Sequence, residues 1–131
     1  MIGLSLSELI QDADWKKEKH VPVIELPTAV SSGEPVMVEV SVGREIPHPN
    51  TPEHFIGWIK LFFHPEGAKF PVEVGDYHFS VHGNGEGAEG SPKAEPFIRA
   101  KVSFDTPGKL MALSYCNIHG LWQGEAEVSV E

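Results

Sequence analysis

Residues 35–42 carry the clearest structural signal in this chain, because valines occupy every second position there. Side chains along a β-strand point alternately to opposite faces, so this period predicts a strand with one buried face. The valines concerned are Val36, Val38, Val40 and Val42. Similar but less regular patterns predict further strands at residues 21–25, 55–63, 72–81, 97–104, 109–115 and 126–130.

Helical periodicity is confined to the beginning of the chain. Ser5 and Glu8 match a capping box ahead of an apolar pair, which predicts a short N-terminal helix. Turn sequences at 65–67 and 106–108 separate neighbouring strand patterns. About seven short strands with turns between them are typical of an antiparallel sandwich, so we expect an all-β fold.

The length and composition favour one domain over residues 1–131, because 131 residues with 40% hydrophobic content supply one core. Residues 83–96 are rich in Gly, Glu, Ala and Pro, and we predict that they form one long mobile loop that serves as a lid or a connector.

The formal net charge of -9 argues against nucleic acid as a partner, because phosphate backbones are bound by clustered Lys and Arg. No apolar run approaches the roughly 20 residues that cross a bilayer. The first nine residues lack the basic start of a signal peptide. We therefore expect a soluble, cytoplasmic protein without a membrane partner.

Cys116 is the single cysteine, so it cannot form an internal disulfide and is either a buried apolar residue or a chemical group. His119 follows it by three residues, close enough for both to bind one ion. Taken alone, such a pair is more often a buried cysteine beside an exposed histidine.

A second candidate segment runs from His48 to His54. Pro47, Pro49 and Pro52 restrict the residues before them to extended geometry, which stiffens the loop. A stiff loop suits a site that holds two imidazoles against a metal, although a proline-rich connector has the same composition.

The third candidate segment is Glu18-Lys19-His20. In an extended chain Glu18 and His20 point to the same side, so both could approach one ion. With Lys16 and Lys17 beside it, the segment also reads as a solvated run of charges.

Together the three segments offer four imidazoles, one thiolate and one carboxylate. The five His and Cys donors exceed the four ligands of structural zinc, and no Met follows His119 as blue copper would require. Iron therefore suits the set best. His64, His78 and His82 have no Cys or carboxylate at matching spacing, and we interpret them as structural or surface residues.

The same segments resemble the signatures of superoxide reductases, the family of neelaredoxin and the desulfoferrodoxin iron-binding domain. The matching motifs are Glu18-Lys-His-Val-Pro-Val-Ile-Glu25, Gly43-Arg-Glu-Ile-Pro-His-Pro-Asn50 and Ser114-Tyr-Cys-Asn-Ile-His-Gly-Leu-Trp122. The resemblance implies an immunoglobulin-like sandwich, commonly a homotetramer, that takes electrons from rubredoxin or a similar small protein and reduces superoxide to hydrogen peroxide.

The resemblance also implies roles for single residues. It places His20, His48, His54 and His119 around the equator of a mononuclear non-haem iron that cycles between Fe2+ and Fe3+, with Cys116 on its axis. Glu18 matches the sixth ligand of the resting ferric state, and Lys19 matches the residue that guides superoxide.

Two departures from the family pattern stand out. Members often read Thr-Thr-Glu-His-His where this chain has Thr51-Pro-Glu-His-Phe55, which keeps the spacing to His54 but alters the packing of the loop. Members with a second iron carry an additional domain with four cysteines, and with its one cysteine this chain resembles the one-iron class.

Other functions fit parts of the same pattern. Cys116 and His119 could serve as nucleophile and base of a thiol hydrolase. A non-catalytic iron protein that transfers electrons is a second alternative, and dismutation of superoxide is a third because it depends on a reduction potential that the sequence does not give.

Overall fold

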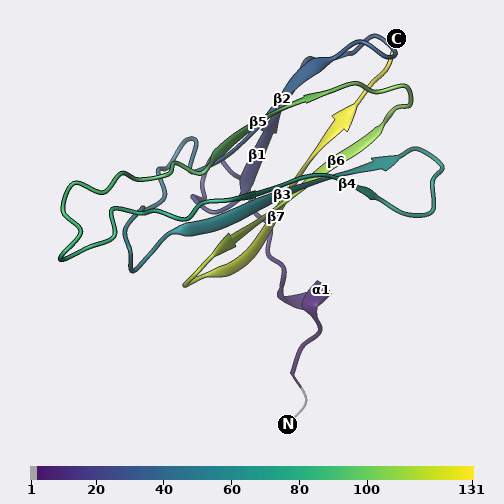
Figure 1. The fold of residues 1–131 in the computed structure, drawn as a ribbon. Helices are drawn as coiled ribbons and strands as arrows, with labels where there is room; N and C mark the ends of the chain where they lie inside the picture. Colours follow the sequence, from purple (N-terminus) through teal and green to yellow (C-terminus); the bar gives the residue numbers. More distant parts are fainter. Residues whose placement is uncertain (1–2) are drawn as a thin grey trace.

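The computed structural model describes residues 3–131, which form two antiparallel sheets packed face to face (Figure 1). The smaller sheet has the strand order β1-β2-β5, and the larger has the order β4-β3-β6-β7. The strands are β1 (Pro22–Glu25), β2 (Val36–Val42), β3 (Ile56–Pro65), β4 (Val72–His78), β5 (Phe97–Val102), β6 (Gly108–Cys116) and β7 (Gly120–Val128). The predicted all-β antiparallel sandwich is thereby confirmed.

The core lies between the two sheets and follows the alternation in the sequence. Val38 and Val40 of β2 are completely buried, and so are Ile59 and Leu61 of β3 on the facing sheet. Burying one such side chain contributes about 1.5–3 kcal/mol, so the inward residues of these strands hold the sheets together.

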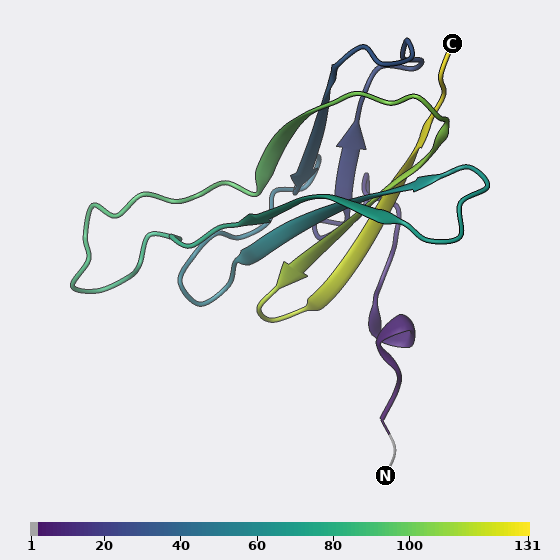
Figure 2. The same cartoon turned by 45° about the vertical axis from the view of Figure 1, so that its right-hand side comes forward.

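The short helix α1 (Leu6–Leu9) confirms the prediction from the capping box. The Ser5 backbone amide and hydroxyl both donate to the Glu8 carboxylate, at 3.2 and 2.7 Å. The segment that carries α1 extends away from the sandwich, as Figure 2 shows. Within residues 3–131 no helix has the length and apolar character that a bilayer span requires.

The largest difference from the predicted strands concerns β7, which begins at Gly120 and not at residue 126. It pairs with β6 along its whole length, from Cys116 opposite Gly120 to Gly108 opposite Val128. The first part of β7 is held by hydrogen bonds to β6. The alternation of side chains in the sequence therefore does not predict it. The other predicted strands differ from the observed ones only at their ends.

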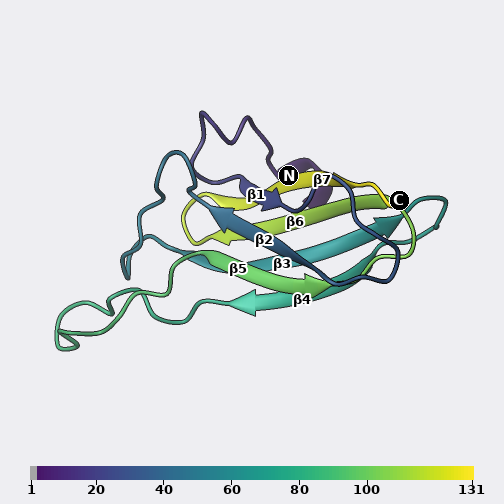
Figure 3. The ribbon, with the colours of Figure 1, turned by 90° about the horizontal axis from the view of Figure 1, so that it is seen from above.

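Strand register brings the candidate segments to one end of the sandwich. Pro22 at the start of β1 pairs with Val42 at the end of β2, and Ile56 at the start of β3 pairs with Cys116. Figure 3 shows the connecting loops gathered at this end, together with the long connection between β4 and β5. Residues 83–96 lie in that connection and form a loop as predicted, and their mobility stays a prediction.

Candidate metal centre

Four of the predicted ligands form a compact cluster at this end of the sandwich. One ligand atom each from His20, His54, Cys116 and His119 lies within 4.8 Å of the others. His20 lies two residues before β1 and His54 two residues before β3, while Cys116 ends β6 and His119 directly precedes β7. The cluster therefore depends on both sheets.

His48 joins the three histidines in a closed ring of imidazoles. The ring centroids are 4.8 Å apart for His20 and His48, 4.7 Å for His48 and His54, 5.1 Å for His54 and His119, and 4.8 Å for His119 and His20. Neighbouring planes are inclined by 57–76°. All four predicted histidines thus lie around one centre.

Hydrogen bonds on the outer side of the His20 and His48 rings decide which of their nitrogens faces that centre. His20 bonds Glu18 through Nδ1, and Nδ1 of His48 donates to the Pro49 carbonyl at 2.6 Å. Their Nε2 atoms remain for a ligand, and that of His20 lies 3.1 Å from Nδ1 of His119. Three residues therefore offer Nε2, with His54 as the third, and His119 offers Nδ1.

Two of these nitrogens are left without a partner. Nε2 of His48 and Nε2 of His54 are buried and have no hydrogen-bond partner within residues 3–131. Leaving a buried polar atom unpaired costs about 1–3 kcal/mol, which a metal ion at the centre would offset.

Cys116 contributes the sulfur donor of the cluster. It lies at the end of β6, where its side chain is completely buried. The Sγ atom lies 3.8 Å from Nδ1 of His119 and accepts a hydrogen bond of 3.4 Å from the His119 backbone amide. A nucleophilic cysteine must be reached by its substrate, so this burial disfavours a thiol hydrolase.

The electrostatic state of the rings suits ligation. Burial lowers the pKa of His20 and of His54, and it lowers the pKa of His48 to about 4. Desolvation disfavours the charged form of an imidazole, so these rings are neutral near pH 7 and keep a lone pair for a metal.

The loop that carries His48 folds back because Gly43 allows it. Gly43 has φ of +83°, and a Cβ atom there would lie 2.6 Å from the His48 backbone nitrogen. At the other end of the loop, Thr51 and His54 exchange backbone hydrogen bonds of 3.0 and 3.1 Å. A tight turn thus constrains this end of the loop, and the stiffness expected from the prolines stays a prediction.

Glu18 and Lys19 occupy different surroundings. The Glu18 carboxylate accepts hydrogen bonds from the His20 ring and, at 2.7 Å, from the His20 backbone amide. It therefore lies on the outer side of that ring, and its role as an iron ligand stays a prediction. Lys19 is half-buried, whereas Lys16 and Lys17 are exposed.

Several residues that support the cluster had not been singled out from the sequence. Trp122 stacks on His20, with centroids 4.8 Å apart and planes 13° apart, and its Nε1 donates to the His119 carbonyl at 3.2 Å. The Asn117 side chain accepts from the Phe55 amide at 2.8 Å and donates to the Glu53 carbonyl at 2.9 Å. Only their places within or beside the motifs could have indicated them.

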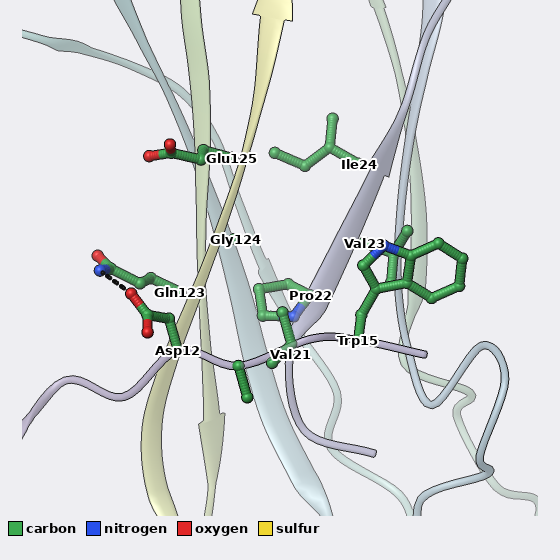
Figure 4. Close-up of a pocket in the computed structure, with 10 residues that line it drawn as sticks. Asp12, Trp15, Val21, Pro22, Val23, Ile24, Gln123, Gly124 and Glu125 are labelled. Carbon is green, nitrogen blue, oxygen red and sulfur yellow. Dashed lines mark hydrogen bonds between the residues drawn. The ribbon is translucent and has the colours of Figure 1, made fainter. Parts of the chain in front are cut away.

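A separate cavity of about 360 Å³ lies where β1 approaches β7 (Figure 4). Its lining includes Trp15, Val23 and Glu125 but no histidine or cysteine, and Gln123 donates to Asp12 at 3.4 Å on its rim. The metal donors therefore belong to a different part of the surface.

The donor set fits iron. A thiolate with imidazoles also suits zinc or copper, but four imidazoles and one thiolate exceed the four ligands of structural zinc. Nε2 of His48 and Nε2 of His54, which are buried without a hydrogen-bond partner in the described residues, leave two further donors available to an ion.

Comparisons with known proteins agree with this geometry. Residues 12–125 match the family model described as desulfoferrodoxin. The superoxide reductase of Thermococcus kodakarensis is 57% identical over 122 residues, 92% of this chain and 96% of that protein. The neelaredoxin of Megalodesulfovibrio gigas is 46% identical, covering 98% of this chain and 100% of that protein.

A solved structure supports the same relationship. The superoxide reductase (neelaredoxin) of Archaeoglobus fulgidus in its reduced form has a TM-score of 0.84 and 54% identity, covering 92% of this chain and 98% of that one. The similarity therefore extends over nearly the whole fold.

Proposed function

This chain belongs to the desulfoferrodoxin family, and from that premise we propose that His20, His48, His54, His119 and Cys116 hold one iron ion. The protein is an oxidoreductase that binds iron and reduces superoxide to hydrogen peroxide. The observation that carries the assignment is the closed ring of four imidazoles next to a buried thiol.

The chemistry needs one electron and two protons for each superoxide. When bound, iron supplies a centre that changes by one electron and has an open position for an anion. The imidazoles would supply neutral nitrogen donors to the iron. The hydrogen bond from the His119 backbone amide to the Cys116 sulfur would adjust the reduction potential of the iron.

Superoxide is an anion, and a chain of net charge -9 repels it at long range. Lys16, Lys17 and Lys19 form a local basic cluster immediately before His20. We therefore propose that Lys19 guides superoxide. As in the family that the motifs resemble, Glu18 would be the sixth ligand of the resting ferric ion once its carboxylate leaves the His20 ring, to which it is bonded here.

The electron comes from outside the chain, and a rubredoxin or a similar small redox protein is the proposed donor. His119 is exposed at the surface although it belongs to the cluster, which offers such a donor a short path to the iron. We further propose a cytoplasmic homotetramer, on the basis of the family resemblance.

Metal analysis with visible spectroscopy tests the assignment. Protein made with iron supplied should contain one iron per chain, show an intense thiolate-to-ferric band when oxidised and lose it when reduced. Cys116→Ser should abolish the band. Stoichiometric zinc without iron, or a band unchanged in the variant, would overturn the proposal.

A further inference from the structure

His82 is a buried histidine outside the metal cluster, with only 5% of its surface exposed. It lies beyond the end of β4, at the root of the long loop 83–96. A buried imidazole needs partners for its nitrogens, and His82 has one nearby, the Phe79 carbonyl, and one from a distant segment, Asn50.

Both ring nitrogens of His82 point at oxygen acceptors. Nδ1 donates to the Oδ1 atom of Asn50 at 2.8 Å, and Nε2 lies 3.0 Å from the Phe79 carbonyl. The orientation of the Asn50 amide is fixed, because its Nδ2 donates to the Ala94 carbonyl at 3.0 Å. Neither nitrogen of His82 is therefore left for a metal.

Asn50 lies two residues after His48, so these bonds join the metal-binding loop to loop 83–96. The root of loop 83–96 is itself tied together, since Ala94 donates to the Val81 carbonyl at 2.8 Å and Gly83 to the Pro92 carbonyl at 2.9 Å. Further along, a Cβ atom on Gly85 would lie 3.6 Å from Pro52. The two loops thus pack against each other at several points.

The other side of the metal-binding loop also contacts His82. The ring of Phe55, which directly follows His54, stacks on His82 with centroids 4.0 Å apart and planes 14° apart. Phe55 is also one of the two positions, with Pro52, at which this chain departs from the Thr-Thr-Glu-His-His pattern. One imidazole therefore holds the loop near both His48 and His54.

We propose that His82 is a positioning residue that locks the loop carrying His48 and His54 to the root of loop 83–96. The Asn50 bond fixes the loop near His48, and the Phe55 stack fixes it near His54. The residues at the root of loop 83–96 thereby help to hold His48 and His54 in position. The role toward iron rests on the proposed function, because it takes His48 and His54 as ligands.

His82→Phe tests the lock, because phenylalanine keeps a ring against Phe55 but makes neither hydrogen bond. In metal-free protein, amide hydrogen exchange over residues 48–55 should become several-fold faster, while exchange in β3 and β6 stays unchanged. His64→Phe is the matched control, since within residues 3–131 the His64 ring bonds only the Ala68 carbonyl and lies at the far end of β3. It should leave residues 48–55 unchanged.

The iron-loaded protein gives the second readout. His82→Phe should release iron to a chelator several-fold faster than wild type and shift the thiolate-to-ferric band, neither of which His64→Phe should do. A lock that serves only stability would leave the band where it is.

Asn50→Leu removes both the oxygen acceptor for His82 and the donor to the Ala94 carbonyl, so it tests the same link if His82→Phe does not fold. It should speed exchange over residues 48–55. Unchanged exchange in the folded variants would overturn the proposal. If wild-type protein binds no iron, the proposed function fails. Hydrogen exchange in the metal-free protein would still show whether His82 holds the loop of residues 48–55.

Discussion

The carboxylate of Glu18 accepts hydrogen bonds from both the backbone amide and the ring Nδ1 of His20. The ring is also stacked on Trp122 and nearly completely buried. A carboxylate on the outer nitrogen of a ligating histidine fixes the orientation of the ring and makes the other nitrogen a better donor. Glu18 can therefore act on the metal without touching it.

Glu18→Ala should lower the affinity for iron by about 10–100-fold, because the ring of His20 loses the partner that orients it. Glu18→Gln keeps one oxygen acceptor and should lose less. Competition with a chelator measures both affinities. An unchanged affinity together with an altered resting ferric spectrum would assign Glu18 to direct ligation in place of orientation.

Lys19→Ala should slow the second-order reaction of the reduced protein with superoxide. Salt should slow the wild type more than the variant, since screening shortens the reach of charges to about 8 Å at physiological ionic strength. Lys17→Ala is the control, because it removes equal charge two residues farther from His20. Pulse radiolysis would refute a local role if the two variants and wild type reacted at one rate across a salt series.

Gly43→Ala should destabilise the metal-free protein by more than the about 1–3 kcal/mol that a left-handed backbone costs an ordinary residue. The new Cβ would also meet the His48 backbone at 2.6 Å. Gly67→Ala is the matched control, with φ of +82° and nothing within 4 Å of the added atom. Equal free energies of unfolding in urea for both variants would show that the close approach is unimportant.

His48→Leu should affect metal binding and stability in opposite directions. It removes the unpaired Nε2, which costs about 1–3 kcal/mol, and also the Nδ1 bond to the Pro49 carbonyl, which contributes about 0.5–1.5 kcal/mol, so the metal-free protein should be at least as stable as wild type. Iron binding should weaken because one donor is lost.

Ser114→Ala provides the contrast to that variant, because its buried hydroxyl donates to the His20 carbonyl at 3.2 Å. It should destabilise the metal-free protein by about 1 kcal/mol. Thermal unfolding with and without iron measures both variants, and a His48→Leu protein that loses stability without metal would contradict this reading of the site.

Removing iron from the wild type should lower the unfolding temperature, because an ion that binds only the folded state stabilises it, by about 2.7 kcal/mol at 100 times its Kd. The lost protection should concentrate in the loop of His48 and His54 and in the turn of Cys116 and His119. Uniform loss of protection over all strands would contradict a site confined to one end of the sandwich.

The sequence determined the sandwich and the residues that meet at its end. Valine alternation at 36–42 reports which side chains are buried, and burial is what a β-strand pattern encodes. The three-residue spacing of Cys116 and His119 likewise predicted that both would lie near one ion, and the turn between β6 and β7 brings them together. Such local signals need no knowledge of the partner strand.

Only the tertiary structure decided the contacts between distant segments. The start of β7 depends on pairing with β6, and the choice of Nε2 in His20 and His48 depends on the hydrogen bond that each Nδ1 makes. His82 has no motif of its own, yet it bonds Asn50 from 32 positions away. Such contacts arise from strand register and loop packing. These bring distant residues together without leaving a periodic pattern in the sequence.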